Sequence, residues 1–275
     1  MTTSTLIINE SFAATVSRLK ASLPQGILLH GDQGVGLHTI AQHLAGGTVV
    51  TLQPKDKKGE VDAIGGTISV EQVRDLYEQT RSGGVPVVII DDAERMSTAA
   101  QNAFLKLLEE PSSKLHFILT SHHPDRLLPT IRSRVQAYHV PRITDAQSNL
   151  ILSSTRLNDT ERVQALFLAS GRPALLLYLS NQPNKLAAQA VIMNDARQFL
   201  SDPSRYNRLK SALQYATSRT DALQLVDATL QIIRHSIYRS PTTQQAATAN
   251  KLLALRDALE HNASPRLQLV QFVLE

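Results

Sequence analysis

The sequence contains no cysteine among its 275 residues, and this absence removes several kinds of chemistry at once. Disulfide bonds, thiol catalysis and cysteine-ligated zinc are all excluded. Tryptophan is absent as well, and aromatic residues make up only 4% of the chain. With hydrophobic residues at 42%, the chain can still build a core, and this composition suits a helical protein rich in alanine and leucine.

Long apolar runs are also missing. No run approaches the roughly 18 residues of a membrane span. The N-terminal segment MTTSTLIINE lacks the basic stretch followed by an apolar stretch that is typical of a signal peptide. We therefore expect a soluble, cytoplasmic protein. Its formal net charge of +4 is mildly basic and only weakly indicates nucleic acid as a partner.

The most informative stretch covers residues 85–140. Within it, the β-branched residues 87–90 (VVII) run directly into two carboxylates, Asp91 and Asp92. An unbroken apolar run that ends in a polar turn indicates a strand buried on both faces, as in a parallel sheet.

A helix and a second strand are predicted next. Ser97 or Thr98 is suited to cap the helix, and Pro111 to end it. Its apolar residues recur at helical spacing: Ala100, Ala103, Phe104, Leu107 and Leu108. The second strand, at 116–119, ends at polar residues, and a short helix closes at 131–134. This alternation predicts a βαβ unit whose polar strand ends carry a site.

A glycine-rich loop, GDQGVGLHT, occupies residues 31–39 between an apolar strand and a helix. In such a loop, backbone N–H groups and the helix N-terminus face an anion. Gly31 and Gly36 match the pattern G-x-x-x-x-G-K-[ST], but Leu37 takes the lysine place and His38 the Ser/Thr place. Leucine cannot neutralise phosphate charge, and histidine is a poor ligand for magnesium. Three hypotheses follow: a vestigial site, weak nucleotide binding without hydrolysis, or an active ATPase.

Two segments, AAQNAFLKLLEEP and FILTSHHPDRLLPTIRSR, closely resemble the AAA+ modules of clamp-loader subunits. The C-terminal HNASPRLQLVQFVLE is similar to the last collar helix of bacterial members of that family. Asp91 and Asp92 resemble the Walker B segment, in which the first acid holds magnesium and the second helps to position the attacking water. The resemblance places Ser121 at the sensor position. A solvated strand end is the alternative interpretation of the two acids.

The tripeptide Ser133-Arg134-Val135 resembles the Ser-Arg-Cys motif of clamp loaders. The resemblance implies that Arg134 is an arginine finger that acts in trans on ATP held by a neighbouring subunit, with Ser133 beside it. An arginine can neutralise the charge that develops on a γ-phosphate. The alternative is a surface arginine paired with an acid.

The resemblance also divides the chain into three domains. An AAA+ α/β domain with a degenerate P-loop is expected at 1–141, a three-helix lid at 142–185, and an all-α collar of about five helices at 186–275. In active relatives the third lid helix carries an arginine that reaches the nucleotide. Here Ala174 takes that place, and Arg172 lies two residues earlier.

Other kinds of site find no support in the sequence. Four histidines fall near the motifs described above: His38, His43, His122 and His123. Their spacing matches no metal-binding pattern, and no G-x-S-x-G or similar nucleophile motif occurs. We therefore expect neither a metal nor a cofactor.

The resemblance implies a subunit of the bacterial DNA polymerase III clamp loader whose own ATP site is empty. Its partners would be clamp-loader subunits of the gamma, tau and delta types, the sliding clamp, and primed DNA through the assembled complex. It would not be an enzyme by itself, but it would belong to the DNA-directed DNA polymerase holoenzyme. Two alternatives are an active AAA+ ATPase or DNA-processing motor with an atypical P-loop, and a stand-alone adaptor.

Overall fold

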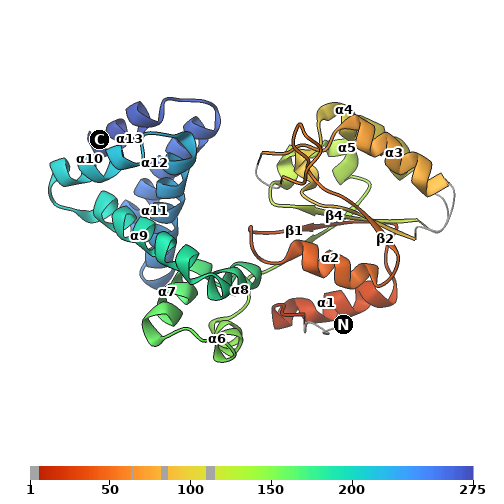
Figure 1. The fold of residues 1–275 in the computed structure, drawn as a ribbon, viewed down its shortest axis with the longest axis horizontal. Helices are drawn as coiled ribbons and strands as arrows, with labels where there is room; N and C mark the ends of the chain where they lie inside the picture. Colours follow the sequence, from red (N-terminus) through yellow and green to blue (C-terminus); the bar gives the residue numbers. More distant parts are fainter. Residues whose placement is uncertain (1–5, 63–64, 82–85, 110–114, 275) are drawn as a thin grey trace. The chain divides into compact units, whose positions relative to one another are not determined.

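The computed structural model describes residues 6–62, 65–81, 86–109 and 115–274, so the predicted helix stop at Pro111 lies outside the described residues. The chain divides into two compact units, Met1–Asn181 and Gln182–Glu275. In Figure 1 the first unit contains a sheet flanked by helices and then three further helices, whereas the described part of the second is helical.

Five parallel strands form the sheet, in the order β2-β3-β4-β1-β5. Their bounds are β1 Gly26–His30, β2 Val49–Leu52, β3 Val87–Ile90, β4 His116–Ser121 and β5 Gln136–His139. The predicted parallel α/β sheet is therefore confirmed, and β3 is buried along its whole length. Strand β5 was not predicted from the sequence. It lies at the edge of the sheet with mostly exposed side chains, so it has no apolar run to mark it.

Helices cover both faces of the sheet (Figure 1). One face carries α1 (Glu10–Ala21) and α2 (Leu37–Ala45). The other carries α3 (Val70–Arg81), α4 (Thr98–Glu109) and α5 (Pro129–Arg132). The central strands are buried because apolar side chains of these helices pack against them from both sides.

Helix α4 begins where the sequence predicts. The Ser97 Oγ accepts a hydrogen bond from the Ala100 N–H at 3.1 Å, as a helix cap does. Farther along the helix, the Phe104 ring packs edge-on against Phe117 of β4, with ring centroids 5.2 Å apart. This helix therefore fixes the position of β4 from one face of the sheet.

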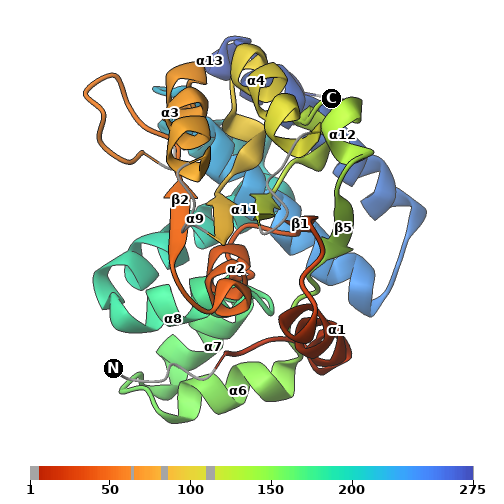
Figure 2. The same cartoon turned by 90° about the vertical axis from the view of Figure 1, so that its right-hand side faces the viewer.

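Strand β4 lies between β1 and β3 and is parallel to both, so the carboxyl ends of these three strands meet at one edge of the sheet. Figure 2 shows the outer strands β2 and β5 on opposite sides of the sheet. Two backbone hydrogen bonds continue this alignment past the strands. Gly31 N donates to Ser121 O at 3.3 Å, and Asp91 N donates to Leu52 O at 2.9 Å. The first bond holds the glycine-rich loop after β1 to the end of β4, and the second holds the acids after β3 to the end of β2.

Three helices complete the first unit, α6 (Asp145–Ser153), α7 (Asp159–Ala169) and α8 (Pro173–Asn181). Both α6 and α7 start with a capping box, in which the cap side chain and the third helical residue bond each other's backbone. The three helices match the segments from which the sequence predicts a lid, and α6–α8 are called the lid helices below.

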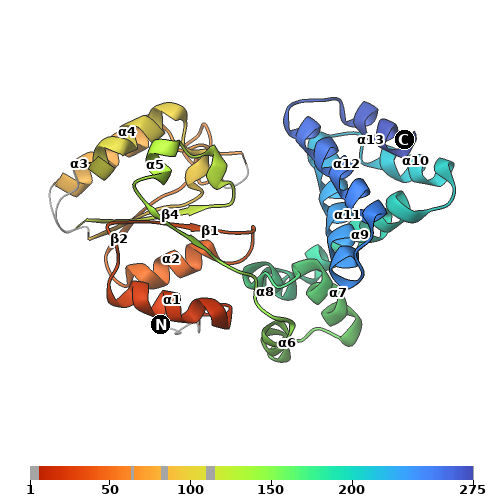
Figure 3. The same ribbon diagram turned by 180° about the vertical axis from the view of Figure 1, so that it is seen from behind.

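The second unit contains five helices in its described residues (Figure 3). They are α9 (Pro183–Ser201), α10 (Arg205–Gln214), α11 (Arg219–Arg239), α12 (Thr243–Glu260) and α13 (Pro265–Leu274). The number of helices agrees with the sequence-based prediction. They share one apolar core, in which Phe199 of α9 stacks on Phe272 of α13 with ring centroids 5.2 Å apart. Among the described residues, no helix combines the length and the apolar character needed to cross a membrane.

A truncation tests the independence of the two units. A chain that ends at Asn181 keeps both cores that flank the sheet. We expect it to fold, to keep mixed α/β circular dichroism and to melt cooperatively. A control chain that ends at Leu225, within α11, splits the core of the second unit and should aggregate or lose helix content. An unfolded fragment of residues 1–181 would contradict the division.

Candidate functional site

The glycine-rich loop has the shape of a phosphate-binding loop. It connects β1 to α2, and Gly34 and Gly36 both adopt positive φ angles, of 89° and 92°. Glycine adopts such angles without steric cost, which explains both residues. A Cβ atom on Gly31 would come within 2.8 Å of the Val140 carbonyl oxygen, so a side chain is excluded there as well.

The lysine position of the loop is turned into the core. The Leu37 side chain is only 3% exposed and belongs to the same apolar cluster as Val35 and Ile40. A lysine amine at this depth would lose its hydration unless it found a partner. Leu37 stabilises the start of α2 by packing, and it offers no charge to a phosphate.

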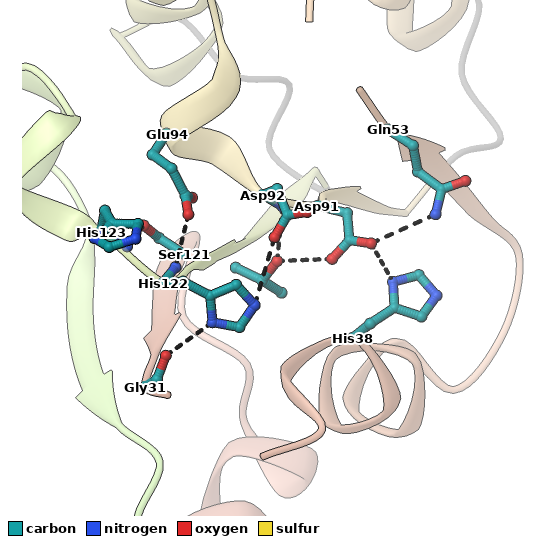
Figure 4. Close-up of polar contacts among 10 residues, drawn as sticks. Gly31, His38, Gln53, Asp91, Asp92, Glu94, Ser121, His122 and His123 are labelled. Carbon is teal, nitrogen blue, oxygen red and sulfur yellow. Dashed lines mark hydrogen bonds and ion pairs between the residues drawn. The ribbon is translucent and has the colours of Figure 1, made fainter. Parts of the chain in front are cut away.

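The Ser/Thr position of the loop contacts the first of the two acids (Figure 4). The Nδ1 atom of His38 lies 2.9 Å from Oδ2 of Asp91, as an ion pair rather than a well-aligned hydrogen bond. Thr120 of β4 donates from its hydroxyl to Oδ1 of Asp91 at 2.7 Å, and Gln53 donates to Oδ2 at 3.4 Å. Both oxygens of Asp91 therefore have partners from this chain. His38 stands where a magnesium ligand would be expected, and its nitrogen is engaged with the carboxylate.

Burial and neighbouring charges make the two acids ionise differently. The contact with Asp91 raises the pKa of His38, although partial burial opposes this. Burial alone would raise the pKa of Asp91, but the contacts with His38 and Thr120 outweigh it and lower that pKa. Burial and the adjacent Asp91 charge raise the pKa of Asp92, while His122 partly opposes the shift. Asp91 is thus held as an anion, and Asp92 takes up a proton more readily.

A second histidine connects the glycine-rich loop to Asp92. The Nδ1 atom of His122 lies 2.8 Å from the Gly31 carbonyl oxygen, and its Nε2 lies 3.6 Å from Oδ1 of Asp92. A carbonyl oxygen only accepts hydrogen bonds, so Nδ1 carries the proton. The backbone N–H of His122 donates to Oε1 of Glu94 at 2.9 Å. From the sequence, His122 is only a histidine without metal-ligand spacing, and no pattern there predicts its contact with Asp92.

At the end of β4, Thr120 is the side chain that reaches the acids. Ser121, to which the resemblance assigns the sensor position, is fully buried, and its Oγ accepts a hydrogen bond from the His123 N–H at 3.1 Å. Consecutive residues of a strand point to opposite faces, so Thr120 and Ser121 face different surroundings. The backbone N–H of Asp92 also donates to the Thr120 hydroxyl, at 3.0 Å.

The lid helices are joined to the loop through its backbone. Ala174 N and Leu175 N, at the start of α8, both donate to the Gly34 carbonyl oxygen, at 3.0 and 3.3 Å. A Cβ on Gly34 would lie 2.9 Å from Cβ of Leu175, which shows how closely the two segments approach. Arg142 also donates from Nε to Oδ2 of Asp32 in the loop, at 2.6 Å. The start of α8 thus binds a carbonyl oxygen of the loop.

Arg172 does not replace the arginine that is absent at Ala174. Its guanidinium donates to the carbonyl oxygens of Ala169 and Leu168, at 2.8 and 2.7 Å. These carbonyls lie in the last turn of α7, where a cation is favourable. These contacts hold Arg172 on the lid helices themselves.

Arg134 follows α5 and is paired with an acid. Its Nη2 donates to Oε1 of Glu109 at 2.7 Å, and its Nη1 donates to the Thr130 carbonyl oxygen at 3.1 Å. The arginine and glutamate side chains remain 39% and 50% exposed. Ser133 beside it donates to the same Thr130 carbonyl, at 3.1 Å. An exposed ion pair of this kind contributes little to stability, so it leaves Arg134 accessible to another partner.

The remaining histidines form no metal centre in the described part of the chain. His43 lies 3.1 Å from the Lys20 ammonium through its Nε2, at a distance from the acids along α2. No group of three or more acidic or histidine side chains among the described residues is arranged to hold a metal ion.

Comparison with solved structures identifies the fold. The structure of a DNA polymerase III gamma subunit-related protein from Thermotoga maritima aligns with a TM-score of 0.55 at 18% identity, covering 94% of this chain and 97% of that one. At this identity the likeness concerns the fold alone. The chain has an AAA+ fold, in agreement with the parallel sheet and the glycine-rich loop.

Comparison of sequences then shows which proteins the chain is similar to. Residues 49–144 match the family model described as DNA polymerase III, delta subunit. The chain is 32% identical over 185 residues to DNA polymerase III subunit delta' of Pseudomonas aeruginosa, covering 55% of this chain and 54% of that protein. It is 34% identical over 146 residues to subunit delta' of Escherichia coli K12, covering 51% of this chain and 42% of that protein. These matches confirm the resemblance to the clamp-loader family and to its delta-prime type. The chain spans about half the length of these relatives.

The contact between His38 and Asp91 predicts a pH-dependent effect of replacing His38. His38→Asn keeps a side-chain nitrogen but cannot carry a charge. The folded-state pKa of His38 lies above the ordinary value of about 6.5, so its stabilising contribution is complete below that pH and is lost as pH rises through the raised pKa. We expect the free energy of unfolding of the variant to be lower by about 1 kcal/mol near pH 6, and to converge with that of the unmodified chain under alkaline conditions.

His43→Asn is the matched control for that experiment, because His43 lies on the same helix. Burial and the nearby Lys20 lower the pKa of His43. Protonated His43 therefore does not stabilise the fold, and replacing it should not lower the free energy of unfolding at low pH. Urea unfolding at a series of pH values measures both variants. A difference for His38→Asn that grows with rising pH would contradict the assignment.

Proposed function

We propose that this chain is a non-hydrolysing subunit of the DNA polymerase III clamp loader, of the delta-prime type. It assists the ATP-driven loading of the sliding clamp onto primed DNA during replication. Similarity to delta-prime subunits supports the family part of the proposal. The contact between His38 and Asp91 carries the non-hydrolysing part, because it occupies the carboxylate on which magnesium would be expected.

The residues around the loop do not fit a magnesium nucleotide. The lysine position is the buried Leu37, and the Ser/Thr position is a histidine bound to the acid. The lid position of the missing arginine is Ala174, whose N–H is bonded to the loop itself. The chain is therefore not an enzyme by itself, and the ATP is hydrolysed by other subunits of the holoenzyme.

The domains have separate roles in this proposal. Residues 1–141 form the AAA+ α/β domain, 142–185 the lid, and 186–275 a collar that joins the chain to subunits of the gamma, tau and delta types. Large apolar side chains on the helical unit remain exposed and could be covered by such partners: Tyr206 at 74%, Leu267 at 64% and Leu274 at 54%. The assembly works in the cytoplasm and reaches the clamp and primed DNA as a complex.

Arg134 is the residue that this chain supplies to a neighbour. Its guanidinium is exposed, and its ion pair with Glu109 can exchange for a phosphate without a large loss of stability. Ser133 belongs to the same motif and lies at the C-terminal cap of α5. In this arrangement Arg134 neutralises charge on the γ-phosphate of ATP in the adjoining subunit.

The first test of the proposal concerns ATP. The isolated chain should show no ATP turnover and at most weak ATP binding, since Leu37 and His38 replace the residues that bind phosphate and magnesium. Isothermal titration calorimetry and a phosphate-release assay measure the two quantities. Micromolar affinity with magnesium-dependent hydrolysis would instead support an active AAA+ ATPase or DNA-processing motor.

The second test concerns Arg134. In a reconstituted clamp loader, Arg134→Ala should lower DNA-stimulated ATP hydrolysis and clamp loading several-fold, while complex formation is retained. Arg134→Lys should restore little, because an ammonium lacks the planar fork that grips phosphate. Stability of the isolated variants should change by less than about 0.5 kcal/mol.

The chain offers two matched controls for this test. Arg132 lies nearby and is also exposed, with its guanidinium on Asp125 at 3.1 Å, so Arg132→Ala should leave both rates unchanged. Glu109→Gln removes the acid that holds Arg134 and should not lower the rate of ATP hydrolysis or of clamp loading. Unchanged rates for Arg134→Ala, with assembly verified, would show that Arg134 is only a surface cation paired with Glu109.

A further inference from the structure

Both oxygens of the Asp91 carboxylate have partners from the chain itself. Its Oδ1 accepts from Thr120 at 2.7 Å, and its Oδ2 has Gln53 at 3.4 Å and His38 at 2.9 Å (Figure 4). The side chain is only 17% exposed. Thr120 is itself 1% exposed within β4 and cannot withdraw. The group that a cation would have to displace is therefore His38, which is 35% exposed.

His122 makes the corresponding connection on the other acid. Its ring spans from the Gly31 carbonyl oxygen, 2.8 Å from Nδ1, to Oδ1 of Asp92, 3.6 Å from Nε2. Gly31 opens the glycine-rich loop and Asp92 follows β3, so the ring joins two segments that are far apart in the sequence. Figure 4 shows both rings lying against the pair of acids, with His38 approaching from α2 and His122 from the end of β4.

We propose that His38 and His122 form an internal brace that takes the place of the metal ion and nucleotide at this edge of the sheet, and that His38 keeps divalent cations from Asp91. The brace joins the start of α2, the glycine-rich loop, the acids after β3 and the end of β4. This inference deepens the proposed function and rests on the part of it that assigns no nucleotide to the site.

The chemistry of imidazole explains why the brace excludes a hard cation. Mg²⁺ prefers oxygen ligands, and imidazole is a poor ligand for it. Carboxylate and carbonyl oxygens suit Mn²⁺ as well. At Asp91, moreover, the Nδ1 atom of His38 lies against the carboxylate as an ion-pair partner. Replacing His38 with a hydroxyl residue would remove the closer of the two partners of Oδ2 and add an oxygen beside it. The site should then accept a cation even without nucleotide.

The experiment measures Mn²⁺ binding to the full chain without nucleotide. His38→Thr restores the residue type that the phosphate-loop pattern has at this position. We expect it to bind Mn²⁺ at least about tenfold more tightly than the unmodified chain, seen as loss of the free-ion signal in electron paramagnetic resonance. Mg²⁺ should raise the melting temperature of this variant and leave that of the unmodified chain unchanged. His38→Ser provides a second variant if His38→Thr does not fold.

His43→Thr, on the same helix, is the matched control and should behave as the unmodified chain does. His38→Thr with the further change Asp91→Asn should lose the gained affinity, which assigns it to Asp91. Equal Mn²⁺ affinity of His38→Thr and the unmodified chain would overturn the inference, as would tight binding by the unmodified chain. An ATP titration of the unmodified chain separates the two proposals. Micromolar ATP binding there would refute the empty site, whereas its absence together with unresponsive variants would refute the brace alone.

Discussion

The carboxylate of Asp91 sits largely buried at the end of a fully buried strand, and a charge in such a place must be satisfied. In this chain the groups that satisfy it come from three other segments: His38 from α2, Thr120 from β4 and Gln53 after β2. Each of these segments is thereby held at the same edge of the sheet. The loop, the acids and the end of β4 keep their relative positions through contacts of the chain with itself.

The sheet order makes these contacts available. Because β4 separates β1 from β3, side chains at its end reach the loop on one side and the acids on the other. Thr120 contacts Asp91, and the His122 ring contacts both the Gly31 carbonyl of the loop and Asp92. The lid helices also reach the loop, where the first amides of α8 bond the Gly34 carbonyl. The loop is thus contacted by the His122 ring at Gly31 and by the start of α8 at Gly34.

Much of this arrangement could be predicted from the sequence because it follows local patterns. The β-branched run before Asp91 predicts a buried strand, and the two glycines Gly31 and Gly36 predict the loop. The helices of the second unit follow from breaks that are visible in the sequence. Edge strand β5 could not be predicted in this way, because its exposed side chains leave no apolar pattern. Hydrophobic patterns report burial, so an exposed element is the one they miss.

The contacts of the site were harder to foresee for a different reason. His38 and Asp91 lie far apart in the sequence, and no spacing rule relates them. The substitution pattern shows that a magnesium ligand is missing, but not that its replacement bonds the acid. In the same way, the motif around Arg134 predicts an exposed arginine, while its pairing with Glu109 depends on how α4 and α5 pack. Side-chain partners of this kind require the tertiary structure.

The hydrogen bonds from α8 to the Gly34 carbonyl have a consequence for how such a chain can change over generations. A single substitution gains little here, because a lysine in place of Leu37 would start from a buried position, and a hydroxyl in place of His38 would remove a partner of Asp91. The lid would still bond the loop through its backbone, which neither of these two substitutions removes. Turning this loop into one suited to a magnesium nucleotide would therefore require several changes together, because each of these contacts opposes a change made alone.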